Sequence, residues 1–126
     1  MSFSDFEPTY IRPRNVGDVA VIAFTVPRLT DDENIEQIGR ELFAVIEHYG
    51  RRKVVVSLAE VSYLTSSVLG KLITLHRRLH RAGGRMVLCG FRDEVADVLE
   101  TSRLDEYFET APDVEAAVAR LQSSPL

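Results

Sequence analysis

Three hydroxyl side chains stand in a row where an apolar strand gives way to a helix. Thr65, Ser66 and Ser67 follow the apolar run 54–58 after a short loop, and helical spacing of apolar residues begins at Val68. The first N–H groups of a helix have no partner inside the helix and the helix dipole is positive there, so a negative charge is stabilised at this point. A serine in this place is well suited to carry a phosphate. The residue types favour a regulatory switch over a catalytic site.

Two other interpretations of these hydroxyl groups stay open. Thr65 or Ser66 could simply cap the helix, because serine and threonine are common N-caps. Ser66 could also be a hydrolytic nucleophile, but the sequence has no Gly-x-Ser-x-Gly motif and suggests no histidine–acid pair to activate it. A glycine-rich phosphate loop and a dinucleotide fingerprint are also missing from the sequence. We therefore expect a protein that is not an enzyme and that needs no cofactor.

Further residues with chemical potential have simpler explanations. His76 and His80 are four apart on a predicted helix and could bind a metal, but no third ligand is suggested nearby, so a solvated or half-buried pair is favoured and no metal site is expected. Cys89 ends an apolar strand, which favours a buried, inert thiol over a redox group.

Basic residues gather near the end of the helix that starts with the serines. The helix end itself accounts for them, because cations complement the negative end of the helix dipole. Contact with an acidic partner or with lipid headgroups is the alternative. The cluster consists of Arg77, Arg78, His80, Arg81 and Arg85.

The composition limits the classes of protein to which this chain can belong. The chain has 126 residues, of which 45% are hydrophobic and 27% charged, and we expect one domain over 1–126 with its core at about 10–121. The net charge of -4 argues against DNA as a partner. No apolar run approaches the roughly 18 to 20 residues of a membrane helix, so membrane insertion is not expected. One cysteine and a polar N-terminus without a signal core favour a cytoplasmic protein.

Alternating strands and helices must position the hydroxyl groups. Residues 1–8 are expected to be a loose lead-in, and the order after them is β-β-α-β-α-β-α-β-α. This order predicts an α/β fold with a mixed, mostly parallel sheet of about five strands and about four helices. The expected strands are 10–13, 19–26, 54–58, 86–89 and 107–108, with a turn at 14–18, and the expected helices begin at 30–33, 65, 92 and 112. Binding sites in such sheets lie where strands end and helices begin, as at 65–67.

The segment 64–70, Leu-Thr-Ser-Ser-Val-Leu-Gly, follows a valine-rich strand and resembles the signature of the STAS domain, the fold of anti-sigma-factor antagonists. The family pattern is Asp-Ser-Ser-Gly-Leu-Gly, with the first serine phosphorylated, and Ser66 matches that serine. The segments 82–90 and 95–108 resemble the strand, helix and short strand that follow in the family. The likeness covers roughly 10–121, is specific from 54 to 108 and is weak before that.

The resemblance implies a STAS-like fold and a regulatory protein-binding module. In the family, the unphosphorylated antagonist binds an anti-sigma factor serine kinase, phosphorylation releases it, and a phosphatase resets it. The resemblance implies phosphorylation at Ser66, with Ser67 and then Thr65 as further choices. It also implies a partner surface of Thr65, Ser66, Ser67, Val68 and Lys71. Thr65 and Val68 replace the aspartate and the glycine of the family pattern.

A different class of function also fits the altered motif. STAS-like domains occur as unphosphorylated scaffolds or accessory subunits of larger complexes, such as lipid-transport ATPases. Neither the kinase, the sigma factor nor the oligomeric state follows from the sequence.

Overall fold

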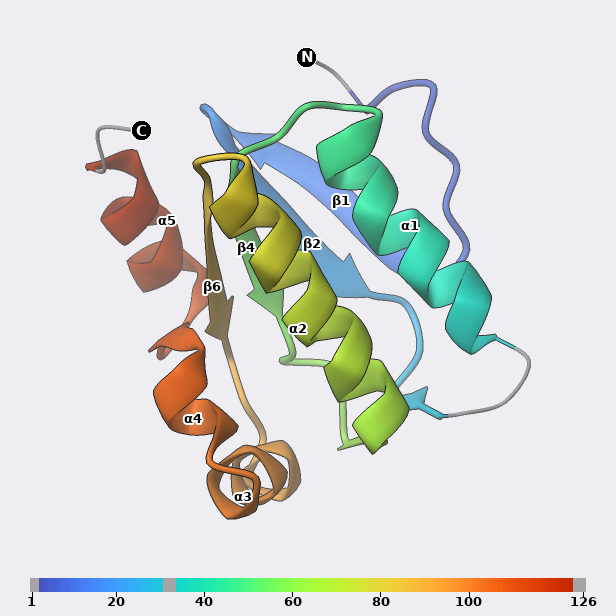
Figure 1. The fold of residues 1–126 in the computed structure, drawn as a ribbon, viewed down its shortest axis with the longest axis vertical. Helices are drawn as coiled ribbons and strands as arrows, with labels where there is room; N and C mark the ends of the chain where they lie inside the picture. Colours follow the sequence, from blue (N-terminus) through green and yellow to red (C-terminus); the bar gives the residue numbers. More distant parts are fainter. Residues whose placement is uncertain (1–2, 31–33, 124–126) are drawn as a thin grey trace.

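A mixed sheet forms the centre of the computed structural model, which describes residues 3–30 and 34–123. Its strand order is β1-β2-β4-β6-β7 (Figure 1). The first two strands pair antiparallel, and every later neighbour pairs parallel. The strands are β1 (Ile11–Val16), β2 (Val19–Phe24), β4 (Lys53–Ser57), β6 (Arg85–Cys89) and β7 (Glu109–Ala111). The expected α/β class and mixed, mostly parallel sheet are confirmed.

Helices cover both faces of this sheet. Two long helices lie side by side on one face, and the last helix covers the other (Figure 1). The two remaining helices lie beyond the end of β6 (Figure 1), and Tyr107 of the second one packs against His76 in the second half of α2. The helices are α1 (Ile35–Glu47), α2 (Ser66–Arg81), α3 (Asp93–Thr101), α4 (Leu104–Tyr107) and α5 (Val114–Gln122).

The period-two alternation of strand side chains divides the core into two layers. In β4, Val54 and Val56 point toward α1 and α2, while Val55 points toward α5. In β6, Leu88 joins the first layer and Val87 the second. Because each strand is buried on both faces, its sequence is a continuous apolar run. The predicted strands in this region therefore lie within one residue of the observed ones.

A second, two-stranded sheet was not expected from the sequence. It pairs β3 (Arg28–Leu29) with β5 (Tyr63–Leu64) in parallel, directly before α2. Two residues are too few to show a period, and the partners lie far apart in the sequence, so no local signal indicates the pairing. This small sheet fixes the path of the chain into the first turn of α2.

The region 103–111 differs from the expectation. The segment 107–108 was predicted to be a strand, but Tyr107 ends the extra helix α4 and Phe108 follows it as the C-cap. Arg103 has φ of 60°, which breaks α3 from α4, so the described part of the chain contains five helices. The aromatic pair has high strand propensity, but burial of Phe108 against the core decides its conformation. The last strand starts only at Glu109.

The N-terminal segment is packed against the domain, which corrects the expected loose lead-in. The rings of Phe3 and Phe6 lie 5.1 and 5.0 Å from the ring of Tyr49, measured between centroids. The Tyr49 hydroxyl donates a hydrogen bond of 3.0 Å to Asp5. Aromatic contacts of this geometry add to burial of the rings, so the segment 3–8 is part of the folded structure.

Three boundaries differ by a few residues, and the first is that of the strand expected over 19–26, which ends at Phe24. The helix start expected at 30–33 falls mostly on residues 31–33, which lie outside the described residues, and α1 begins at Ile35. The turn expected at 14–18 is shorter, because β1 continues to Val16 and only Gly17 and Asp18 lie between the strands. Gly17 has φ of +61°, which a glycine adopts without strain.

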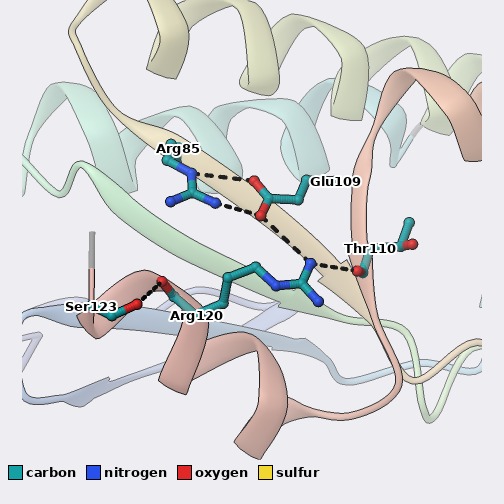
Figure 2. Close-up of polar contacts among 5 residues, drawn as sticks. All are labelled: Arg85, Glu109, Thr110, Arg120 and Ser123. Carbon is teal, nitrogen blue, oxygen red and sulfur yellow. Dashed lines mark hydrogen bonds and ion pairs between the residues drawn. The ribbon is translucent and has the colours of Figure 1, made fainter. Parts of the chain in front are cut away.

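Charged side chains fasten the last strand and the last helix to the sheet (Figure 2). The Glu109 carboxylate on β7 accepts hydrogen bonds from both Nε and a terminal nitrogen of Arg85 on β6. Arg120 on α5 lies 3.5 Å from the same carboxylate and donates to the Thr110 carbonyl oxygen at 2.7 Å. We call Arg85, Glu109 and Arg120 the Glu109 clasp. It holds a strand of only three residues at the sheet edge.

Candidate functional site

The hydroxyl groups predicted to form the site lie at the first turn of α2. Ser66 and Ser67 are the first two residues of the helix and both are exposed. Thr65 occupies the N-cap position and is half-buried. Its N–H donates to the carbonyl oxygen of Leu29 at 3.1 Å, so the small β3–β5 sheet holds the helix start in place. The serines thus stand at the edge where β4 and β6 end (Figure 1).

The first turn of α2 has backbone donors without partners. The Thr65 side chain sits at the N-cap but accepts no capping bond, so the open interpretation of Thr65 as a side-chain cap does not hold. Its Oγ1 is buried and has no partner among the described residues. The first helical bond runs from the Leu69 N–H to the Thr65 carbonyl oxygen at 3.1 Å. The N–H groups of Ser66 and Ser67 are therefore available to an anion at the positive end of the helix dipole.

Val68 belongs to the core, which corrects its assignment to the partner surface. Its side chain is 0% exposed. The residue faces the same way as Leu72, Leu75 and Leu79, which are also fully buried and follow at helical spacing. A valine at this position cannot meet a partner unless the helix moves.

Lys71 is directed at α1 and not at the serines. Its Nζ lies 3.5 Å from the Glu36 carboxylate, and its side chain is 25% exposed. The lysine stem lies against Gly39, where a Cβ would come within 3.1 Å of it. Lys71 therefore helps to join α1 to α2, and only a quarter of its side chain is accessible to a partner.

Gly70 and Ser66 lie on one exposed side of α2. They are one turn apart, which places them above one another on the helix surface. A Cβ built at Gly70 meets nothing within 4 Å. The fold does not require a glycine here, and the open backbone leaves room for another molecule next to the serine.

Sequence reasoning missed two residues of this surface. Arg28 and Tyr63 face each other across the β3–β5 sheet, with the guanidinium carbon 4.4 Å from the ring centroid. The Tyr63 ring is 43% exposed, and it is one of few large apolar side chains so open in the described ranges. Arginine and tyrosine are the types most often found at the centre of protein interfaces. No sequence signal points to them, because pairing of distant segments brings them to the serines.

The structure brings no general base to Ser66 from the described histidines. His76, on the same helix, packs against Tyr107 and Phe108 with centroid distances of 5.0 and 5.9 Å. Ten residues of helix place it about 15 Å along α2 from Ser66. Residues 3–30 and 34–123 also contain no group of three or more His, Cys, Asp and Glu side chains that could hold a metal ion. In the same ranges no helix is long and apolar enough to cross a membrane.

Comparison with known proteins places this geometry in context. The sequence matches the family described as STAS domain over residues 10–117. A protein of Bordetella bronchiseptica, named as a candidate anti-sigma factor antagonist, BtrV, is 30% identical over 96 residues, which cover 76% of this chain and 82% of the relative.

Solved structures show the same fold. An anti-sigma-factor antagonist (STAS) domain protein from Planctomyces limnophilus superposes with a TM-score of 0.80 at 25% identity, covering 90% of this chain and 98% of that chain. The phosphorylated form of the Bacillus cell fate determinant SpoIIAA superposes with a TM-score of 0.66 at 22% identity, covering 87% and 97% of the two chains.

Proposed function

The chain belongs to the STAS domain family, and from this premise we propose that it is an anti-sigma factor antagonist controlled by phosphorylation of Ser66. Unmodified, it binds an anti-sigma factor serine kinase through the start of α2. Phosphorylated, it lets the kinase go, and a phosphatase restores it. The observation that carries this proposal is the exposed Ser66 on an uncapped helix start.

A phosphate at this place acts on binding more than on folding. It adds about -1.5 to -2 charges at neutral pH. The free N–H groups and the helix dipole accept that charge locally, so the fold is expected to persist. In a closed interface the same charge loses water and repels partner carboxylates. A loss of about 3 to 4 kcal/mol weakens binding several hundredfold, which is sufficient for a switch.

The exposure of the three hydroxyl groups helps to rank them as phosphorylation sites. Thr65 is the last choice because its Oγ1 is buried. Ser67 is exposed and remains the second choice. Ser66 matches the phosphorylated serine of the family, and SpoIIAA, a protein of the same fold, has been solved in both unphosphorylated and phosphorylated forms. We therefore assign the switch to Ser66.

The docking surface of the kinase extends beyond the serines. Ser66 and Gly70 supply an open stretch of helix, and the stacked Arg28 and Tyr63 supply a cation and an apolar ring beside it. Ser67 completes the surface. Val68 lies beneath it and contributes only by supporting the helix.

The decisive experiment is incubation with the cognate kinase and ATP, followed by mass spectrometry of the peptide that contains both serines. We expect one phosphate, located on Ser66. The variant Ser66→Ala should lose it, while the matched variant Ser67→Ala should keep it. Absence of any phosphate on 65–67 in the wild-type protein would contradict the proposal.

A scaffold role without phosphorylation is the second candidate. Thr65 favours it, because a neutral side chain replaces the carboxylate that precedes the phosphorylated serine in the family pattern. In that case the same surface would hold a neighbouring subunit permanently. A complex that survives Ser66→Asp unchanged, together with no detectable phosphate, would select this role.

A further inference from the structure

A basic and aromatic cleft lies on the second half of α2, away from the serines. It opens between α2 and α4 and has a volume of about 380 Å³. Four of its five lining residues come from two adjacent rows of α2 at i and i+4 spacing. The lining residues are His76, Arg77, His80, Arg81 and Tyr107.

Within the described ranges, the two exposed arginines of this cleft form no ion pair. Nearby arginines are paired: Arg78 with Glu47, and Arg85 with Glu109. Arg77 and Arg81 are exposed and have no carboxylate within ion-pair distance among the described residues. Two unpaired guanidinium groups one turn apart make a local positive field on a chain whose net charge is -4.

A fixed aromatic ring forms the other wall of the cleft. The Tyr107 ring is 43% exposed. It is held in place by edge contacts with His76 and Phe108, at centroid distances of 5.0 and 5.2 Å. A ring held by its neighbours loses little freedom on binding, which is the property of a good interface anchor.

The His76 imidazole, which also lines the cleft, has a nitrogen that could form a hydrogen bond with a bound molecule. Nδ1 of His76 is buried and has no partner among the described residues. Burial and the neighbouring His80 lower the pKa of His76, while Glu109 acts in the opposite direction. The lowered pKa of His76 favours its neutral form, so the lasting positive charge of the cleft is that of the arginines. Asp105 and Glu106 precede Tyr107 on α4 but do not line the cleft.

We propose that this cleft docks an acidic segment of a second protein partner. Carboxylates of the segment bind the guanidinium groups of Arg77 and Arg81, and an apolar side chain lies on the ring of Tyr107. Charge complementarity selects an acidic occupant. The open, shallow form and the mixture of two cations with one ring match a peptide segment of alternating acidic and apolar residues.

The cleft and the serine switch can be occupied together. Ser66 and Arg81 stand fifteen residues apart on α2, which is about 22 Å of helix. A kinase contact confined to the first turn of α2 would leave the last turns open. The protein would then have two binding regions on α2. Phosphorylation controls binding at the first turn, whereas the cleft at the last turns binds its partner in both states and keeps the protein in a larger assembly.

The test uses a fluorescein-labelled synthetic peptide of alternating Glu and Ala with one central Phe, measured by anisotropy and by amide shifts in NMR. We expect binding to the wild-type chain, with shifts at His76 and Tyr107. Arg77→Glu with Arg81→Glu should weaken it at least about tenfold. The control, Arg12→Glu with Arg14→Glu on the exposed side of β1, changes the net charge equally and should bind as wild type.

Two results would overturn the inference. One is equal peptide binding by wild type and by the double variant of Arg77 and Arg81. The other is displacement of the peptide by ATP or by phosphatidylglycerol vesicles with shifts at the same residues, which would assign the cleft to a nucleotide or a lipid surface. Ser66 phosphorylation in the double variant should proceed at the wild-type rate, so this test and that of the switch fail independently.

Discussion

The start of α2 and the Glu109 clasp use polar groups in opposite ways. In the clasp, one carboxylate receives two arginines, and one of these also bonds a backbone oxygen (Figure 2). At the start of α2, the helix has no side-chain cap, and Ser66 and Ser67 are exposed. The clasp closes its interactions inside the protein, while the helix start leaves the side chains of Ser66 and Ser67 exposed to solvent.

This difference distinguishes polar groups that stabilise the fold from polar groups that are available for binding. Satisfied polar groups fix an element, as the clasp fixes a three-residue strand that could hardly stay paired alone. Open donors beside an exposed serine contribute little to folding and are free to act in binding. Changes in the clasp should therefore alter stability, and changes at the helix start should alter association.

The largest expected effect is that of Ser66→Asp. A carboxylate at the helix start imitates part of the phosphate charge and should weaken kinase binding by about 3 to 4 kcal/mol, or several hundredfold. The melting temperature should stay the same or rise slightly, since an acid in the first turn is favourable. Calorimetric titration of the kinase measures this, with Glu100→Gln on the exposed face of α3 as a neutral control. If wild type and Ser66→Asp bound the kinase with equal affinity, the start of α2 would not differ from the Glu109 clasp in its role in binding.

The clasp is tested by Glu109→Ala. Loss of the carboxylate leaves Arg85 and Arg120 without their shared partner and should lower the free energy of unfolding by about 1 to 2 kcal/mol. Kinase affinity should not change. Urea unfolding gives the first value and titration the second, with Glu100→Ala expected within about 0.5 kcal/mol of wild type. A fall in kinase affinity would show that the two regions are coupled.

Gly70→Ala sharpens the comparison at the helix start. The added methyl group meets no protein atom within 4 Å, so it should stabilise the helix by about 0.5 to 1 kcal/mol. It should also weaken kinase binding, because it fills space beside Ser66. Gly84→Ala is the contrasting variant: its Cβ would clash with the Arg52 carbonyl oxygen, so this change should destabilise the fold. Loss of stability in Gly70→Ala would mean that the fold itself needs this glycine.

The smallest effect at neutral pH concerns Cys89. Burial raises the pKa of its thiol from 9.0 to about 11, although a hydrogen bond with Ser57 acts in the opposite direction. The thiolate forms more easily in the unfolded chain, so the contribution of Cys89 to stability should be constant below pH 9 and fall as the pH rises from 9 toward 11. Urea unfolding across this range measures the loss, and Cys89→Ala should reduce it. Rapid reaction of the native thiol with Ellman's reagent at pH 8 would contradict this burial.

Much of the fold follows from local pattern. The buried runs around Val55 and Val87 predict central strands because a parallel sheet covered on both faces needs continuous apolar side chains. The spacing of Leu72, Leu75 and Leu79 predicts the inner face of α2. These features depend on near neighbours in the chain, so a sequence pattern contains them.

Features that depend on distant partners were missed or misplaced. The β3–β5 pairing, the packing of Phe3 on Tyr49 and the helical end of Tyr107 all require contacts between segments far apart in the sequence. At the candidate site, the motif predicts the position of Ser66. It does not predict that Val68 is buried or that Arg28 lies beside the serine surface.

The sequence by itself determined the order of the central strands and the longer helices and the place of the serine motif between them, because hydrophobic periodicity and helix-start chemistry act over a few residues. The tertiary structure decided which polar groups find partners. Glu109 meets two arginines from other elements, whereas Ser66 and the pair Arg77 and Arg81 meet none among the described residues. Whether a polar side chain stabilises the fold or binds another molecule depends on what the folded chain brings to it in space.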